Sequence, residues 1–99
     1  MSTLGRYFVY ILASRKYGAL YIGVTNDLIA RTYIHREDIL PGQSSRYHIH
    51  NLVYFEQHDD IDAAITREKR LKKWRRQWKI DRIEQTNPDW HDLYPDLLG

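Results

Sequence analysis

A carboxylate interrupts an apolar helical stripe in the second half of the chain. At about 100° per residue, helical geometry places Glu68 near the centre of one face. The same face carries Ile61, Ala64, Ile65 and Leu71. An unpaired buried carboxylate is costly, so we expect Glu68 to face either a base or a metal ion. The structural alternative to a metal ligand is an ion pair with Lys72 or a neighbouring arginine.

Two polar side chains lie one turn apart on an earlier expected helix. Arg31 and His35 are four residues apart, so they emerge from the same surface and can converge on one group. Arginine donates charge-assisted hydrogen bonds to phosphate, and histidine can donate to a phosphoryl oxygen or transfer a proton near neutral pH. The plain alternative is a solvated surface pair, which is common on helices.

Two tyrosines lie on the strands of an expected hairpin. Residues 6–12 and 19–24 are rich in β-branched and aromatic side chains, and the polar segment 13–18 predicts a turn. A symmetric loop gives facing partners whose numbers sum to 31, which pairs Tyr10 with Tyr21 in contact on one face. They are either site residues or ordinary aromatic stabilisers of the sheet.

The other elements complete an α+β pattern. A tight hairpin joins antiparallel strands, so we predict a small three-stranded antiparallel sheet flanked by helices, with the partner of the third strand undetermined. Asn87 as cap and Pro88 in the first turn predict a terminal helix. The remaining expected elements are helices at 26–39, 61–74 and 76–84 and a strand at 52–56.

Composition narrows the class of protein. The 99 residues, 42% of them hydrophobic, can build one core, so we expect a single domain over 1–99, with its core at about 6–82 and a helical extension at 83–99. The absence of cysteine excludes disulfides and thiolate chemistry and favours a cytoplasmic location. No apolar run approaches the ~20 residues that cross a bilayer, so we expect no membrane segment.

Positive charge is concentrated in one segment. Residues 67–82 contain nine Lys or Arg and two acids, a local charge of +7 in a chain of net charge +2. Basic groups neutralise phosphates, and Trp74 and Trp78 can stack on bases, so the segment suits nucleic acid; a solvated helix face is the alternative. The candidate nucleic-acid contacts are Lys69, Lys72, Lys73, Arg75, Arg76 and, from the loop before the third strand, Arg46.

Histidines give a weaker metal hypothesis. His48 and His50 share a face if that stretch is extended, and with His58 they suggest zinc. Because there is no cysteine and the carboxylate partners are undefined, scattered surface histidines are the preferred interpretation. Gly-rich phosphate loops and the H-E-x-x-H motif are absent.

Taken in order, these motifs resemble the small stand-alone members of the GIY-YIG endonuclease superfamily. Phe8-Val-Tyr10 stands at the first triplet of the family, and Tyr21-Ile-Gly23 is the second triplet to the letter. Arg31, His35 and the helix at 67–74 follow in the family's order. The resemblance covers about residues 6–82.

The resemblance implies metal-dependent hydrolysis of a nucleic-acid phosphodiester, with DNA as the expected substrate and one divalent ion, Mg²⁺ or Mn²⁺. By motif match Glu68 would hold the metal, and Tyr21 would receive a proton from the attacking water. Arg31 would stabilise the developing charge. Tyr10 and His35 would position the water or the leaving group.

Two positions differ from the family pattern, and a third is a candidate match to it. Phe8 replaces the first glycine of the family pattern. Val24 stands where some repair-type members carry a lysine, which removes one candidate activator of the tyrosine. Asn87 is a candidate for an asparagine that the family carries near the end of the domain.

Two rival functions remain open at this point. One is a non-catalytic nucleic-acid-binding module with the same fold. The other is a protein-interaction domain that uses the acidic residues of the last segment, Asp89, Asp92 and Asp96. A nuclease of this kind would obtain specificity from a partner protein, a homodimer or the shape of the nucleic acid.

Overall fold

Strand β1 (Tyr7–Ala13) is the centre of a three-stranded sheet. The computed structural model describes residues 6–37 and 49–99. Strands β2 (Leu20–Thr25) and β3 (Asn51–His58) flank β1 in the order β2-β1-β3, and both pairings are antiparallel. The predicted α+β class is confirmed, and the undetermined partner of the third strand is β1. Each strand lies within two residues of its expected range.

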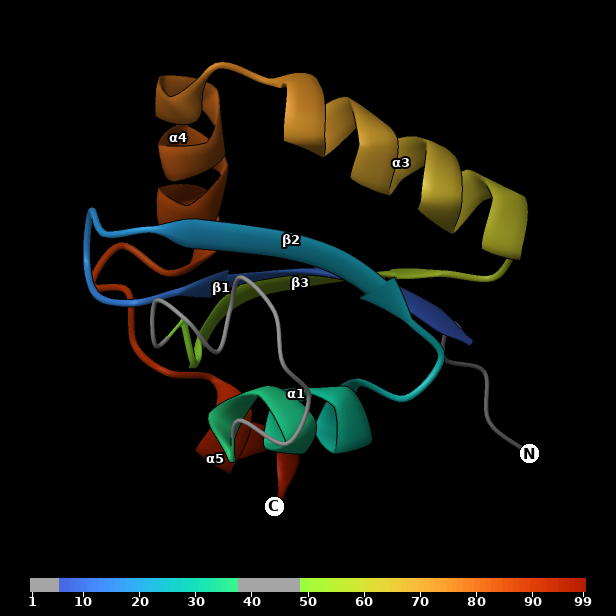
Figure 1. Cartoon of the computed structure of the whole chain (residues 1–99), viewed down its shortest axis with the longest axis horizontal. Helices are drawn as coiled ribbons and strands as arrows, with labels where there is room; N and C mark the ends of the chain where they lie inside the picture. Colours follow the sequence, from blue (N-terminus) through green and yellow to red (C-terminus); the bar gives the residue numbers. More distant parts are fainter. Residues whose placement is uncertain (1–5, 38–48) are drawn as a thin grey trace.

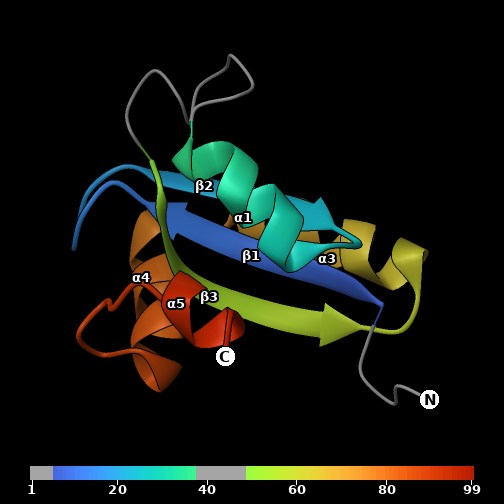
Figure 2. The same cartoon turned by 90° about the horizontal axis from the view of Figure 1, so that it is seen from below.

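Helices cover both faces of this sheet (Figures 1 and 2). Helices α3 (Ile61–Lys73) and α4 (Arg76–Thr86) lie on one face, and α1 (Leu28–Arg36) and the short α5 (Tyr94–Leu97) lie on the other. Side chains alternate along a strand, so β1 contributes to both cores. Val9 and Ile11 pack with α3 and α4, whereas Tyr10 and Leu12 pack with Leu28 of α1.

Aspartate side chains fix the starts of two helices. Asp27 accepts a hydrogen bond from the backbone N–H of Ala30 at 3.1 Å, so α1 begins two residues later than expected. Asp60 accepts from the N–H of Ala63 at 2.9 Å and starts α3 where it was predicted. The predicted end of the first helix lies outside the described residues. No helix in the described ranges is long and apolar enough to cross a membrane.

The predicted terminal helix after Asn87 is wrong. Asn87 instead follows the last residue of α4, and its side-chain amide donates to the carbonyls of Val53 at 3.1 Å and His91 at 2.9 Å. Trp90 has a φ of +58°, which a right-handed helix cannot accommodate, and its indole N–H donates to Glu84 at 2.7 Å. These contacts hold the segment against the sheet, and α5 begins only at Tyr94.

The hairpin register differs from the symmetric prediction. Tyr10 pairs with Gly23, not with Tyr21, because the loop closes with a hydrogen bond from the N–H of Ser14 to the carbonyl of Ala19 at 3.0 Å. The offset is two residues, so the faces are unchanged. Tyr10 and Tyr21 remain diagonal neighbours with ring centroids 6.4 Å apart. The predicted contact is confirmed, and the predicted direct pairing is wrong.

Gly23 leaves room for the side chain of Tyr10. A Cβ at position 23 would lie 2.4 Å from the hydroxyl oxygen of Tyr10 and 2.6 Å from its Cζ. Real Cβ atoms do not approach other heavy atoms so closely, so any larger residue would displace the tyrosine. The glycine is therefore required by the close approach of a ring across β2.

We predict that Gly23→Ala destabilises the fold by about 1–3 kcal/mol, as overpacking does, although removing a strand glycine is otherwise favourable. Urea denaturation measures this cost in the wild-type and Tyr10→Leu backgrounds. Leucine lacks the ring atoms that the new methyl group would meet, so the cost should fall in that background. An equal cost in both backgrounds would show that Tyr10 does not create the constraint.

Candidate active site

Tyr10, Tyr21 and His35 form an aromatic cluster against β2. His35 lies on the buried side of α1 with Leu28 and Thr32, a helical spacing that directs it to the sheet. Its ring packs on Tyr21 with centroids 4.9 Å apart, and its Nε2 lies 3.2 Å from the hydroxyl oxygen of Tyr10. The structure thus brings together three of the residues that the sequence singled out.

Burial controls the protonation of this cluster. It raises the pKa of Tyr10 far above its ordinary value of 10, and the neighbouring Tyr21 adds to the rise. Burial also lowers the pKa of His35, and the positive charge of Arg31 lowers it further. At neutral pH Tyr10 is therefore protonated and His35 neutral, and the bond between them joins two uncharged groups. Tyr10 is a poor proton acceptor in this environment.

Arg31 and Glu68 bring opposite charges to the cluster from the two faces of the sheet. Arg31, on α1, lowers the pKa of Tyr10 electrostatically, whereas Glu68, on α3, raises it. The charges of Arg31 and Glu68 therefore both act on Tyr10, which also contacts Tyr21 and His35.

Glu68 lies on the inner side of α3. Its side chain is 13% exposed, and Ala64 and Leu71 beside it are fully buried, as the helical stripe predicted. Ile61 is 39% exposed, so the stripe does not extend to the start of the helix. The ammonium of Lys72 lies 2.8 Å from Oε2 of Glu68. The carboxylate thus has the ion-pair partner that the structural alternative named.

The donor set around Glu68 suits a hard divalent ion that keeps most of its water. Mg²⁺ is commonly bound by one or two carboxylates together with water and substrate phosphate. Glu68 supplies one carboxylate in a setting that already attracts a cation. Within the described ranges no three His, Cys, Asp or Glu side chains cluster as metal ligands. Of the zinc candidates, His58 hydrogen-bonds Glu56, and His48 lies outside those ranges.

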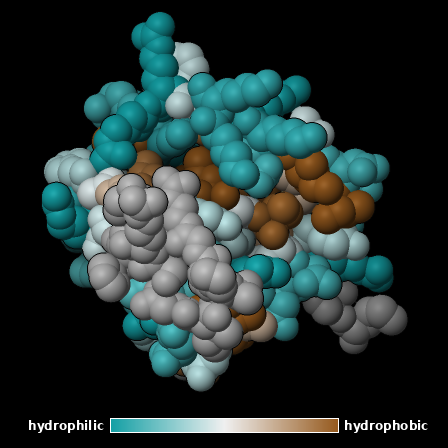
Figure 3. All heavy atoms as spheres, in the orientation of Figure 1, coloured by the Kyte–Doolittle hydropathy of each residue, from teal (hydrophilic) through white to brown (hydrophobic). Residues whose placement is uncertain are grey.

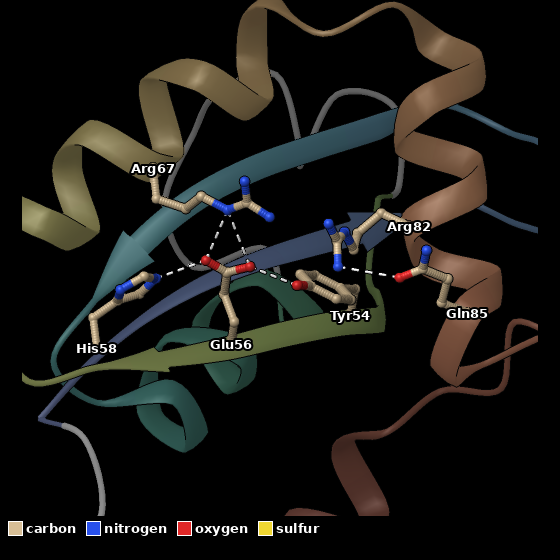
Figure 4. A network of polar contacts seen from close by, with 6 residues as sticks. All are labelled: Tyr54, Glu56, His58, Arg67, Arg82 and Gln85. Atoms are coloured by element: carbon tan, nitrogen blue, oxygen red, sulfur yellow. Dashed lines mark hydrogen bonds and ion pairs between the residues drawn. The ribbon is translucent and has the colours of Figure 1, made fainter.

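Arg67 anchors α3 to β3 one residue before Glu68 (Figure 4). Its Nε donates to both carboxylate oxygens of Glu56, at 3.2 and 3.0 Å. The hydroxyl of Tyr54 donates to the same carboxylate at 2.5 Å, and Nε2 of His58 lies 2.6 Å from it. This anchor fixes the rotation of α3, and with it the direction in which Glu68 projects.

The sequence analysis missed this cluster, although a signal for it exists. Tyr54, Glu56 and His58 alternate along β3, which places all three on the face that α3 covers. Burial raises the pKa of Glu56, but hydrogen bonds from Tyr54, His58 and Arg67 outweigh it, so the pKa is lowered overall. Burial and Glu56 together raise the pKa of Tyr54 to about 12. Glu56 is therefore ionised and Tyr54 protonated at neutral pH.

In the part of the chain that the structure describes, the predicted nucleic-acid contacts include side chains that are exposed without an ion pair and side chains that bond other residues of the protein. Lys69, Lys73 and Arg75 are exposed, and Figure 3 shows hydrophilic side chains crowding the edge formed by α3. Arg76 is engaged, because its guanidinium donates to the carbonyls of Tyr17 at 2.7 Å and Gly18 at 2.6 Å. Lys72 is paired with Glu68, as described above. Arg46 lies outside the described residues.

The two tryptophans of the basic segment differ in the same way. Trp74 is half-buried between the guanidinium groups of Arg67 and Arg82, 5.0 and 5.8 Å from its ring centroid. Trp78 is 52% exposed, with Arg75 at 5.6 Å from its ring. Of the two rings, Trp78 is the more accessible to a base. Asn87 is 5% exposed and bonded to β3 and His91, so the structure does not bring it to the aromatic cluster.

Comparison with known families gives one match. Residues 6–81 match the family model described as the GIY-YIG catalytic domain. The matched range contains β1, β2, α1, β3 and α3, and with them all five residues around the β2 edge. Comparisons with curated proteins and with solved structures give no significant match.

We predict that Glu56→Gln lowers stability at pH 7 and flattens its dependence on acid. Because folding lowers the pKa of Glu56, its contribution is present at neutral pH. That contribution is lost as the pH falls below about 4.5, the ordinary glutamate value, and through the folded pKa. Urea denaturation at pH 7 and pH 3 measures both effects.

The matched control is Asp59→Asn, which removes an exposed acid near the same helix. It should shift stability by no more than about 0.5 kcal/mol at either pH. Equal stability of wild type and Glu56→Gln at pH 7 would contradict the anchoring role of this cluster.

Proposed function

The chain belongs to the GIY-YIG family, which is a nuclease-type family, and we propose that it is a metal-dependent endonuclease that hydrolyses phosphodiester bonds of DNA. The observation that carries the proposal is the convergence of Tyr10, Tyr21, Arg31 and His35 with Glu68 around one sheet edge. A phosphodiester needs positive charge on its oxygens, a proton acceptor for the attacking water and a site for a cation. These side chains supply each of those functions.

Glu68 would hold the divalent ion, Mg²⁺ or Mn²⁺. When bound, the ion supplies charge neutralisation for the phosphate and lowers the pKa of water. Arg31 donates from the opposite side of the site to the non-bridging phosphate oxygens, where negative charge increases during the attack. Glu68, through the ion that it would hold, and Arg31 would thus both offer positive charge to the phosphate.

Tyr21 is the tyrosine that accepts the proton of the attacking water. It is only partly buried and lines a surface groove, whereas Tyr10 is 1% exposed and held in its protonated form. A tyrosine accepts a proton only as the phenolate, and an ordinary tyrosine has a pKa near 10. The role therefore requires nearby positive charge, from Arg31 or from an ion at Glu68, that favours the phenolate. Tyr10 is a positioning residue, since its hydroxyl holds His35, and the ring of His35 packs on Tyr21.

The exposed part of the basic segment binds the nucleic-acid backbone. Lys69, Lys73 and Arg75 present charges that no acidic side chain neutralises in the described part of the chain. Trp78 offers a ring on which a base can stack. Salt-sensitive binding with little sequence preference follows from contacts of this kind.

A non-catalytic nucleic-acid-binding module is the second candidate. The observation that favours it is the 2.8 Å ion pair between Glu68 and Lys72, because a structural glutamate needs such a partner. A module of this kind would bind DNA without forming products in any metal. The cleavage experiment below separates the two candidates.

We predict that Glu68→Gln abolishes metal-dependent cleavage and leaves the domain folded. The amide keeps the size of the side chain but loses the charge that binds Mg²⁺. Labelled branched, nicked and single-stranded DNA are incubated with each protein in Mg²⁺, Mn²⁺ or chelator, and circular dichroism reports folding. The control Asp62→Asn removes an exposed acid from the same helix and should cleave normally. Binding without products by the wild type in every metal would favour the module.

We predict that Lys73→Ala lowers the dependence of DNA affinity on salt. Each lysine that neutralises a duplex phosphate contributes a slope of about −0.9 in log affinity against log salt, so the slope should fall by up to about one unit. The measurement is a salt titration of affinity in chelator. Arg76→Ala is unsuited to this test, since it would release the hairpin carbonyls. An unchanged slope would remove Lys73 from the backbone contacts.

A further inference from the structure

A groove of about 380 Å³ runs along β2 beside the aromatic cluster. Its walls are Leu20, Tyr21 and Ile22 of β2, together with Lys72 at the end of α3 and Lys79 on α4. The lining contains two ammonium groups and no acid. Tyr21 lines the groove and also belongs to the aromatic cluster. Leu20 and Ile22 pack on the side of α3 and α4, whereas the ring of Tyr21 packs on the side of α1, so the groove and the cluster adjoin across the edge strand β2.

Lys79 is a partly buried cation without a counter-ion. Its ammonium donates to the backbone carbonyl of Lys72 at 3.3 Å, and within the described ranges no carboxylate lies within 4.0 Å of it. Burial lowers the pKa of Lys79, and the nearby Arg76 lowers it further. A charge partly shielded from water and next to another cation gains from an anion that joins it. The free groove therefore favours the binding of an anion.

Lys72 supplies a second ammonium at the same place. In the free protein it pairs with Glu68, but its side chain is 54% exposed and lines the groove. If a divalent ion binds Glu68, Lys72 loses that partner and is repelled by the ion. Its flexible side chain can then turn toward an anion in the groove. An ion bound at Glu68 would therefore make the groove more positive, because the charge of Lys72 would no longer be neutralised by Glu68.

Arg76 holds the far end of this groove in place. It bonds the carbonyls of Tyr17 and Gly18 and so ties the start of α4 to the hairpin turn. Leu20 follows that turn directly, while Lys79 lies one helical turn beyond Arg76. The distance between the lysine wall and the β2 wall is thus fixed by two hydrogen bonds. A fixed, cationic groove suits a small hard anion such as a phosphate group.

We propose that Lys79 and Lys72 form a phosphate subsite that binds the nucleic-acid backbone next to the phosphate held at Tyr21. The proposal rests on the proposed nuclease function, because that function places a phosphate at Tyr21. Lys79 is the main ligand, since it has no competing acid. An edge strand presents unpaired backbone N–H groups, so β2 can add donors to the same phosphate. The subsite fixes the direction in which the strand crosses the active site.

The test compares Lys79→Met with wild type in DNA binding. Fluorescence anisotropy with labelled nicked duplex, in chelator, gives the affinity at several salt concentrations. We expect Lys79→Met to bind about five- to tenfold more weakly and to reduce the salt slope by about one. Lys79→Arg keeps the charge and should bind within about twofold of wild type. The control Lys16→Met removes a lysine that lies against the ring of Tyr17 on the hairpin loop and should change neither quantity.

A second measurement locates the bound group. Amide shifts of Leu20, Tyr21 and Ile22 are followed by NMR during titration with inorganic phosphate and, separately, with the nicked duplex. Shifts in wild type that disappear in Lys79→Met place a phosphate in the groove. Shifts with duplex alone identify the backbone of a strand, and not free phosphate, as the occupant. Unchanged affinity, slope and amide shifts in a folded Lys79→Met protein would overturn the proposal.

The outcomes for the subsite and for hydrolysis are separate. If wild type never cleaves but its binding depends on Lys79, the proposed hydrolysis is wrong and the subsite stands. If wild type cleaves in Mg²⁺ while Lys79→Met binds and cleaves equally well, hydrolysis stands and the subsite is wrong.

Discussion

The packing of Tyr10 across Gly23 is the contact on which the site depends. Tyr10 stands on the central strand, so it is fixed by pairing on both sides. Because position 23 carries no side chain, the tyrosine hydroxyl reaches the edge strand and bonds His35 from α1. Tyr21 then completes the cluster as a diagonal neighbour of Tyr10. Tyr10 on the central strand thus determines where His35 of α1 and Tyr21 of β2 lie.

The basic segment contributes to the structure as well as to the proposed binding of nucleic acid. Arg67 and Arg76 donate hydrogen bonds within the protein. Arg67 donates to Glu56, and Arg76 donates to two carbonyls of the hairpin turn. These two anchors hold the beginning of the segment against β3 and the start of α4 against the turn between β1 and β2. Because Arg67 holds the middle of α3 against β3, Glu68 stays on the inner side of the helix, and Lys69 and Lys73 remain exposed. A local charge of +7 therefore overstates the charge available to a ligand.

The sequence predicted the elements better than their connections. Strand composition, the aspartate caps and the inner position of Glu68 follow from local chemistry, so these predictions hold. The hairpin register depends on how a six-residue loop closes, which spacing alone does not determine. The segment after Asn87 fails as a helix because Trp90 has a left-handed φ, and because Asn87 bonds β3 while Trp90 bonds Glu84 of α4. In the Glu56 cluster, Tyr54, Glu56 and His58 share one face of β3, but Arg67 of α3 reaches them only after the helix packs on the sheet.

The ion pair with Lys72 makes the mostly buried carboxylate of Glu68 compatible with the folded state. Glu68 is mostly shielded from water, and without a partner its charge would oppose folding. Lys72 removes that cost, yet its own side chain is largely exposed, and such half-exposed pairs contribute only about 0–1 kcal/mol. Releasing the lysine is therefore inexpensive. The pair that makes Glu68 compatible with the fold is weak enough for Lys72 to leave it, which is what the proposed metal-binding role of Glu68 requires.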